Sequence, residues 1–193
     1  MNFKKLEITG FKSFSEKTNF LIENGLTGIV GPNGCGKSNI VESLRWCMGE
    51  NSAKSMRGSG MEDVIFSGTS NRPSKNISEV ALLLDNQNKE GPAQYKEFDE
   101  VTVKRKIEKD KGSKYYINNK EVRARDVQTF FADLSTGAHS PSLISQGRIG
   151  QLVTAKPIER KSILEEAAGI SGIHARRQEA ETRLNAAENN LKR

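Results

Sequence analysis

Cysteine is scarce in this sequence, and long apolar runs are missing from it. The 193 residues include two cysteines, Cys35 and Cys47, which are close in the sequence but differently placed, so we do not expect a structural disulfide. A reducing compartment fits this cysteine content best. No apolar run approaches the roughly 18 residues that a membrane span needs, and the N-terminus lacks the hydrophobic region of a signal peptide. These absences predict a soluble, cytoplasmic chain without a membrane partner.

Internal repeats and low-complexity tracts are missing as well, and the length favours one domain. A chain of this length buries about 70% of its unfolded surface and sustains a core without disulfides. The formal net charge is +6 and the pI is about 9.3. A basic balance favours contact with a polyanion, but it serves solubility equally well. Charge alone therefore leaves both interpretations open.

The most specific pattern is a glycine-rich segment near the N-terminus. Residues 27–39 read TGIVGPNGCGKSN, with Gly31 followed after four residues by Gly36, Lys37 and Ser38. This spacing is typical of a loop that binds nucleotide phosphates. Its glycines let the chain turn tightly, Lys37 reaches the β- and γ-phosphates, and the Ser38 hydroxyl ligates Mg²⁺. The predicted cofactor contacts in this loop comprise Pro32, Asn33, Gly34, Cys35, Gly36, Lys37, Ser38 and Asn39.

The flanks of this loop agree with its assignment. We expect a short apolar strand over residues 27–30 and, after the loop, a helix that ends at Gly49. The apolar face of that helix comprises Ile40, Val41, Leu44, Cys47 and Met48. The helix would direct its positive N-terminus at the phosphates. The alternative is a glycine-rich turn without chemical function, which this strand-loop-helix context disfavours.

Short strands joined by polar loops account for much of the remaining chain. Leu6 and Ile8 alternate with polar residues and predict a strand that ends at Gly10. Further strands are predicted over residues 18–22, 80–84, 101–107 and 115–117. Asn118 and Asn119 suit the turn of a hairpin. Because these strands have no helices between them, we expect an α/β fold that combines a parallel, helix-covered nucleotide core with an antiparallel sheet.

The C-terminal third has helix-forming composition from Pro157 onward, with weak points at Gly169 and Gly172. Residues that are apolar or small, with the exception of one arginine, recur there at spacings of four and three, as in the a/d seam of a coiled coil. The seam comprises Ile173, Arg177, Ala180, Leu184, Ala187 and Leu191. An amphipathic surface helix is the alternative, and periodicity over so few heptads does not separate the two. The seam stays in register to the end of the sequence, which favours the coiled coil.

Five motifs occur in an order that resembles the N-terminal head segment of bacterial members of the structural-maintenance-of-chromosomes (SMC) family. They are Gly10–Phe14, Gly31–Asn39, the Arg57-Gly58 pair before Met61–Asp63, Ile144–Gly147 and Glu165–Ile170. The resemblance implies an ABC-type ATPase head built from both ends of a longer chain, with a long antiparallel coiled coil and a hinge between them. Residues 1–170 would form the N-terminal lobe of this head, and residues 171–193 would begin the coiled-coil arm.

The resemblance also implies roles for residues outside the phosphate loop. Gln146 matches the glutamine that contacts Mg²⁺ and the attacking water in this family, a task that suits a neutral amide. Arg57 matches an arginine close to the nucleotide, where it can stabilise charge on the transferring phosphate. Lys12 and Ser13 match a stretch near the adenine and ribose. Cys35 replaces the serine that is more common in the loop, where the family uses mainly the backbone.

Two further segments imitate parts of an ATPase site. Asp85 follows an apolar run, as the Mg²⁺-site aspartate does in many P-loop enzymes, but Asn86 stands where the glutamate that activates water would be. Residues 134–137, LSTG, imitate the ABC signature but precede Gln146, whereas the signature of this family follows the glutamine. The chain is therefore expected to hold half of an ATP- and Mg²⁺-dependent site and to be inactive alone. The family places the missing glutamate and signature on the C-terminal part.

The resemblance implies partners as well. They are the C-terminal head lobe of the same protein, a second head in a homodimer, a kleisin-type subunit and double-stranded DNA. Arg123 and Arg125 are the candidate DNA contacts, and residues 104–106, KRK, would add charge on a neighbouring strand. Contacts to phosphates are independent of sequence. Gly60 stands where some relatives have a lysine, which weakens this patch.

The implied activity is ATP-driven organisation of DNA for chromosome condensation and segregation, in the cytoplasm and associated with the nucleoid. A recombination or repair ATPase with a similar head is the nearest alternative, which the motif over residues 165–170 disfavours. Two alternatives of other classes are a self-sufficient P-loop kinase or GTPase that uses Asp85, and a non-catalytic DNA-binding module. Hydrolysis by the isolated chain would favour the kinase or GTPase, and DNA binding independent of nucleotide would favour the module.

Overall fold

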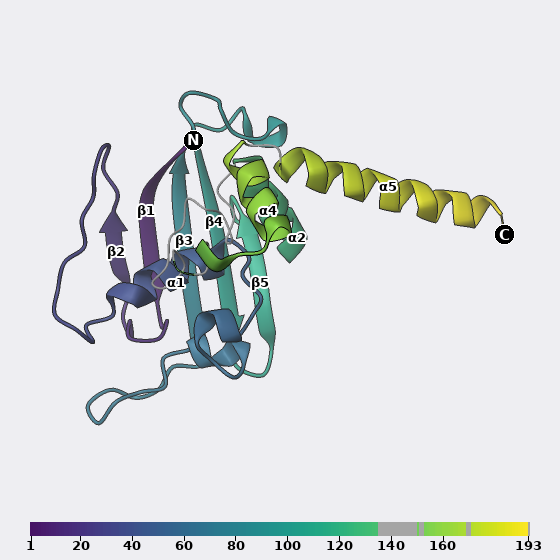
Figure 1. Ribbon diagram of the computed structural model, residues 1–193. Coiled ribbons are helices and arrows are strands. Elements are labelled where there is room, and N and C mark those ends of the chain that lie inside the picture. The colour runs from purple at the N-terminus through teal and green to yellow at the C-terminus, as the bar shows by residue number, and fades with distance from the viewer. Residues whose placement is uncertain (135–149, 151–152, 169–170, 193) are drawn as a thin grey trace.

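The computed structural model describes residues 1–134, 150, 153–168 and 171–192. Within these residues, strands in the order β2-β1-β3-β4-β5-β6 form one sheet in which every neighbouring pair is antiparallel (Figure 1). The strands are β1 (Asn2–Thr9), β2 (Thr18–Leu21), β3 (Ile77–Asp85), β4 (Glu100–Glu108), β5 (Gly112–Ile117) and β6 (Lys120–Val122). The helices are α1 (Lys37–Cys47), α2 (Ala124–Asp133), α4 (Pro157–Ala167) and α5 (Ser171–Leu191), with short 3₁₀ turns η1 (Lys54–Met56), η2 (Met61–Val64) and η3 (Ala93–Tyr95).

Alternation along the strands decides which residues face helix α1. In β4, every second residue from Val101 to Ile107 is buried, and the residues between them are half-buried. The register places buried residues of four strands side by side in rows across the sheet. One row consists of Leu6, Leu82, Val103 and Ile117, and the next of Ile8, Val80, Arg105 and Tyr115. The sheet thus has one buried face, and a charged residue lies on it.

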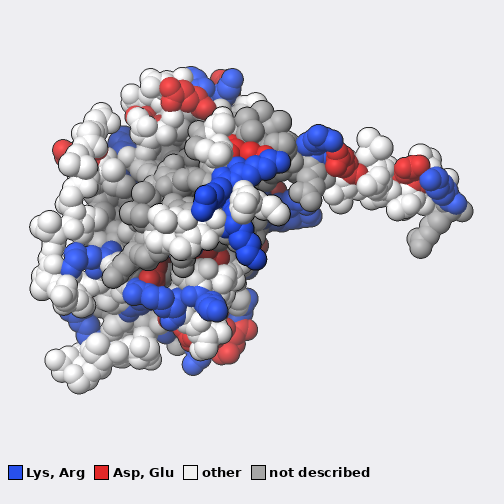
Figure 2. All heavy atoms as spheres, in the orientation of Figure 1, with Lys and Arg blue, Asp and Glu red and all other residues white. Residues whose placement is uncertain are grey.

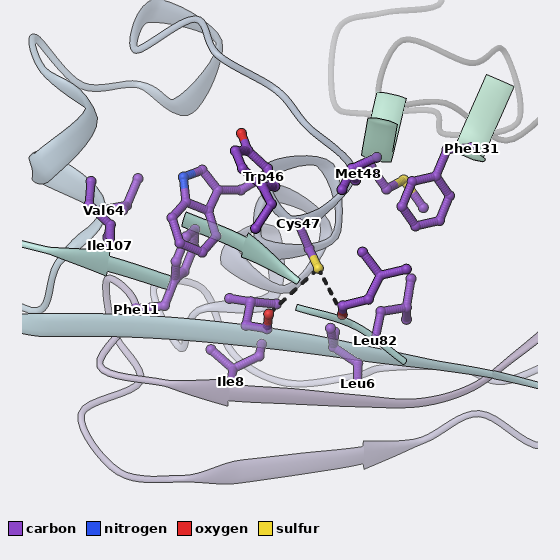
Figure 3. Packing of buried hydrophobic residues seen from close by; sticks show 14 of the residues in the cluster. Leu6, Ile8, Phe11, Trp46, Cys47, Met48, Val64, Leu82, Ile107 and Phe131 are labelled. Carbon is purple, nitrogen blue, oxygen red and sulfur yellow. Dashed lines mark hydrogen bonds between the residues drawn. The ribbon is translucent and has the colours of Figure 1, made fainter. Parts of the chain in front are cut away.

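Helix α1 packs on this buried face through its C-terminal half. Trp46 lies against Phe11, Cys47 points towards the strands, and Met48 lies beside Phe131 in the same buried cluster (Figure 3). The Cys47 thiol is fully buried and donates to the carbonyl oxygens of Val80, at 3.6 Å, and Val103, at 3.4 Å. Burial raises the pKa of this thiol to about 12. Because the end of α1 is fixed on the sheet, its beginning is held at a defined place beside the sheet.

The predicted apolar face of α1 is confirmed in part. Ile40, Cys47 and Met48 are buried as expected, whereas Val41 and Leu44 are half-buried. The polar and aromatic residues of α1 that are also buried are Glu42, Ser43, Arg45 and Trp46. The Ser43 hydroxyl donates to the Ile40 carbonyl at 2.7 Å, which satisfies it inside the core.

The strand predicted over residues 27–30 is wrong for the described structure. Leu26 and Val30 are almost fully exposed, Ile29 is 48% exposed, and the segment has no regular secondary structure. A strand needs a neighbour to satisfy its backbone groups, and none of the described strands lies beside this segment. The predicted parallel nucleotide core is therefore not present within the described residues, whose sheet is wholly antiparallel.

The hairpin and the C-terminal helices follow the sequence predictions. Asn118 and Asn119, with φ of 47° and 63°, form the turn between β5 and β6, as expected of a two-residue hairpin turn. Helix α5 extends away from the rest of the molecule (Figure 1). Its seam residues Leu184 and Leu191 are 68% and 87% exposed. Among the helices that the structure describes, none has the length and apolar composition needed to cross a membrane.

Candidate functional site

The positive N-terminal end of helix α1 has neither a side-chain cap nor an acidic residue in its first turn. Gly36 is the N-cap residue of this helix, with φ of 96°. The first N–H groups of a helix lack intrahelical partners and carry a partial positive charge. Most helices satisfy them with a serine, threonine or aspartate cap. An anion is the complementary group for such a helix start.

Lys37 adds a full positive charge at the same place. Its Nζ donates to the carbonyl oxygens of Gly31 and Pro32, each at 2.6 Å, so the ammonium lies within the loop that precedes the helix. The loop residues 31–35 are exposed, and so is Ser38. Backbone N–H groups, a lysine and a hydroxyl therefore gather around an accessible site. The residues present suit a phosphate group.

Glycine is required at Gly36 for two reasons. Its positive φ disfavours any other residue, and a Cβ at this position would lie 2.5 Å from Ser13 Oγ. Ser13 Oγ in turn accepts from Asn39 Nδ2 at 2.9 Å. The turn after β1, which carries Ser13, is thus packed directly against the beginning of α1.

The structure also brings Arg57 and Lys12 to this helix. Arg57 Nη2 donates to Asn39 Oδ1 at 3.0 Å and pairs with Glu42 Oε1 at 2.5 Å. Lys12 Nζ contacts Glu42 Oε2 and the carbonyl oxygen of Met56. Lys12, Ser13 and Arg57, to which the family resemblance assigns roles near the nucleotide, therefore lie beside the predicted phosphate loop.

Glu42 at the centre of these contacts was not predicted. Its side chain is only 11% exposed, and it pairs with two cations. The sequence does indicate that Glu42 is unusual. It is the sole acidic residue between Glu23 and Glu50, in the segment that carries the phosphate loop and Lys37. A buried carboxylate needs such partners, because an unpaired buried charge is strongly unfavourable.

Some predicted residues lie elsewhere or outside the described residues. Gln146 and residues 135–137 of the signature-like segment are outside them. Asp85 ends β3, where its Oδ1 accepts from the Gln87 N–H at 3.1 Å. This turn role agrees with its interpretation as a structural residue.

The candidate DNA contacts differ in their exposure to solvent. Arg123 and Arg125 are exposed, and the Arg123 N–H donates to Asp126 Oδ2 at 2.9 Å at the start of α2. Arg105, however, is 2% exposed, so its predicted contribution to a basic DNA surface is wrong. Lys104 Nζ lies 3.9 Å from the carboxylate oxygen Oε2 of Glu79. On the face drawn in Figure 2, lysine and arginine side chains form separate groups with acidic side chains among them rather than one continuous patch.

A glycine loop that leads into an uncapped helix, whose first residue is a lysine with its ammonium against the loop, defines a P-loop nucleotide-binding class of protein. The chain belongs to the RecF/RecN/SMC N-terminal domain family, whose model matches residues 2–147. It is 58% identical over all 193 residues to the chromosome partition protein Smc of Cereibacter sphaeroides and 56% identical to that of Rhodopseudomonas palustris. It spans about 17% of the length of these two relatives.

Solved structures of SMC heads share the fold. One, described as an Smc head bound to the C-terminal winged-helix domain of ScpA, has a TM-score of 0.82 and 30% identity over 91% of this chain and 54% of its own. Another, the Pyrococcus furiosus Smc head with an extended coiled coil bound to the C-terminal domain of ScpA, has a TM-score of 0.81 and 31% identity over 99% of this chain and 48% of its own. The predicted fold class, an ABC-type head lobe with a helical arm, is confirmed.

Proposed function

We propose that this chain is the ATP-binding N-terminal lobe of an SMC ATPase head that acts in DNA organisation and chromosome segregation. The observation that carries the proposal is the start of α1, where no side chain caps the helix at Gly36 and the Lys37 ammonium reaches back to the carbonyls of the preceding loop. In this proposal, residues 1–170 form the lobe and residues 171–193 begin the coiled-coil arm. The cellular location would be the cytoplasm, in association with the nucleoid.

Each group at the start of α1 would have one task. The N–H groups of residues 33–39 and the Lys37 ammonium would bind the phosphates of ATP, and the Ser38 hydroxyl would ligate Mg²⁺. The bound Mg²⁺ would neutralise charge on the β- and γ-phosphates. Arg57 would stabilise the charge that develops on the transferring phosphate. Gln146 would orient water, and Lys12 and Ser13 would lie near the nucleoside.

The site needs a second lobe. The expected catalytic glutamate and signature loop are absent from this sequence, and Leu26, Ile29 and Val30 expose apolar surface beside the phosphate loop. Apolar residues at these positions suit a strand that gains its neighbours from another part of the protein. We infer that the C-terminal lobe supplies those neighbours, and we call the two lobes together the assembled head.

The remaining partners are proposed from relatives. ScpA, which is bound in two of the similar head structures, supports a kleisin-type subunit, and a similar structure concerned with ATP-driven dimerisation of SMC ATPases supports a second head. The exposed Arg123 and Arg125 are our candidates for contacts with DNA phosphates, independent of sequence.

The two-lobe proposal predicts activity by complementation. The isolated chain should show no ATP turnover above background, because it lacks a base for water, and turnover should appear when the C-terminal lobe is added. Release of inorganic phosphate measures ATP turnover by the isolated chain and by the mixture of the two lobes. Steady hydrolysis by the pure chain that is lost in Asp85→Asn would instead establish a self-sufficient P-loop enzyme.

The position of Cys35 allows a chemical test of ATP binding. Cys35 is exposed in the loop, 3.8 Å from Lys37 Nζ, whereas Cys47 is fully buried with a pKa of about 12. N-ethylmaleimide should therefore label Cys35 and leave Cys47 unmodified in the folded chain. In the assembled head, Mg·ATP at ten times its Kd should slow labelling of Cys35 about tenfold, because only about one tenth of the sites are then free of nucleotide. Peptide mass spectrometry measures both rates, and a Cys35 rate that ignores Mg·ATP would contradict the assigned site.

A further inference from the structure

Glu42 joins two loops to the helix that follows the phosphate loop. Its Oε1 pairs with Arg57 Nη2 at 2.5 Å, and its Oε2 pairs with Lys12 Nζ. Lys12 comes from the turn after β1, and Arg57 directly follows η1. One nearly buried carboxylate on the second turn of α1 therefore fixes two cations from distant parts of the chain.

The backbone at both cations is unusual. Lys12 has φ of 46° and Arg57 has φ of 54°, in the left-handed region that residues other than glycine rarely adopt. Such conformations persist where surrounding contacts hold them, and they cluster at functional sites. The two side chains that start from these backbones converge on the same carboxylate. This convergence indicates that the contact with Glu42 fixes the direction of each side chain.

The contacts of Arg57 leave most of its guanidinium accessible. Within the described residues, Glu42 Oε1 and Asn39 Oδ1 are both bound by one nitrogen, Nη2, and the side chain is 59% exposed. Asn39 belongs to the first turn of α1, next to Lys37 and Ser38. One edge of the guanidinium is thus held against the helix, while its other N–H groups remain available beside the loop.

We propose that Glu42 is a positioning residue that holds Arg57 in place to meet the phosphate charge of the nucleotide. This inference rests on the proposed function, since it requires ATP at the start of α1. Without the carboxylate, Arg57 and Lys12 would repel each other and lose their common anchor. Glu42 itself would not contact the nucleotide.

The charge balance predicts a specific kinetic signature. Glu42→Gln makes the site more positive by one charge, so the affinity for the anionic ATP should not fall. The hydrolytic rate should fall, because a misplaced Arg57 no longer meets the charge that develops in the transition state. A residue that only stabilised the fold would not separate these two quantities in this way.

The test uses the assembled head and compares kcat with ATP affinity. Glu42→Gln should lower kcat by about tenfold or more while the Kd for ATP stays equal or decreases. In an Arg57→Gln background the same change should have little further effect on kcat, because Glu42 acts through Arg57. Glu42→Asp, which keeps the charge but shortens its reach, should lower kcat with unchanged affinity and serves if the Gln variant does not assemble.

Glu50→Gln is the matched control. Glu50 is 2% exposed, pairs with Arg45 at 3.0 Å and follows the other end of the same helix. Its loss should reduce the melting temperature and leave kcat within about twofold of the wild type.

Two results would overturn the inference alone. One is a wild-type kcat in both Glu42 variants, and the other is a full effect of Glu42→Gln on kcat in the Arg57→Gln background. A wild-type assembled head that neither binds nor hydrolyses ATP would overturn the proposed function as well.

Discussion

Lys37→Ile should abolish ATP binding by the assembled head and leave the fold intact. Lys37 Nζ lies within the phosphate loop, 2.6 Å from two loop carbonyls, and it is the only side-chain cation placed in the described part of that loop. Its charge-assisted contacts with two phosphates would each contribute about 1.5–3 kcal/mol, so their loss weakens binding at least about a hundredfold. Isothermal titration calorimetry measures the affinity, and circular dichroism tests the fold.

Lys17→Ile is the control for this experiment. Lys17 is 61% exposed and pairs with Glu7 at 3.3 Å, so the variant removes the same charge away from the loop. Its ATP affinity should equal that of the wild type. An unchanged affinity in Lys37→Ile would show that the loop does not bind the nucleotide phosphates, and the proposed function would lose its main support.

Features that depend on local chemistry could be predicted from the sequence. The Asn118-Asn119 turn follows from the tolerance of asparagine for positive φ, and both residues have it. The start of α1 at Lys37 follows from the glycines before it, because Gly36 is the N-cap with φ of 96°. The strands follow from alternation of apolar and polar residues. In each case neighbours in the sequence decide the conformation.

Features that depend on partners could not be predicted in this way. Residues 27–30 have the composition of a strand, but a strand forms only beside another, and composition does not say which part of a protein supplies it. The contacts of Glu42 join residues 30 and 15 positions away, at Lys12 and Arg57. A pattern within one helix cannot show that two loops will bring cations to it.

Arg105 illustrates how two sequence signals can conflict. The run KRK over residues 104–106 has the composition of a basic surface, but strict alternation in β4 requires its middle residue to face opposite to the other two. The neighbours of Arg105 on its face are the buried Val103 and Ile107. Alternation therefore predicts a buried arginine, and composition misled the DNA assignment at this position.

The surroundings of Arg105 make its burial favourable. Its guanidinium is stacked against the rings of Trp46, at 4.5 Å, and Tyr115, at 4.6 Å. Its Nη1 donates to the carbonyl oxygens of Trp46, at 2.9 Å, and Glu50, at 2.6 Å, at the C-terminal end of α1. Burial lowers the pKa of this guanidinium below its ordinary value. The residue therefore joins the sheet to the end of the helix whose beginning forms the candidate site.

Arg105→Met should consequently destabilise the chain strongly. The substitution keeps an unbranched apolar side chain, but it leaves the backbone carbonyls of Trp46 and Glu50 without the charged donor that they share. We expect the free energy of unfolding to fall by about 3 kcal/mol, as when a buried charged partner is removed. Urea denaturation followed by circular dichroism measures this quantity.

Lys104→Met separates burial from loss of charge. Lys104 is the preceding residue of the same strand, on the opposite face, with a side chain 27% exposed and 3.9 Å from Glu79. Because a partly exposed pair at this distance contributes little, its loss should cost less than about 1 kcal/mol. Equal effects of the two substitutions would mean that net charge, and not the contacts of Arg105 with α1, determines stability here. A large effect confined to Arg105→Met would instead establish that the helix carrying the phosphate loop is held in place from its far end.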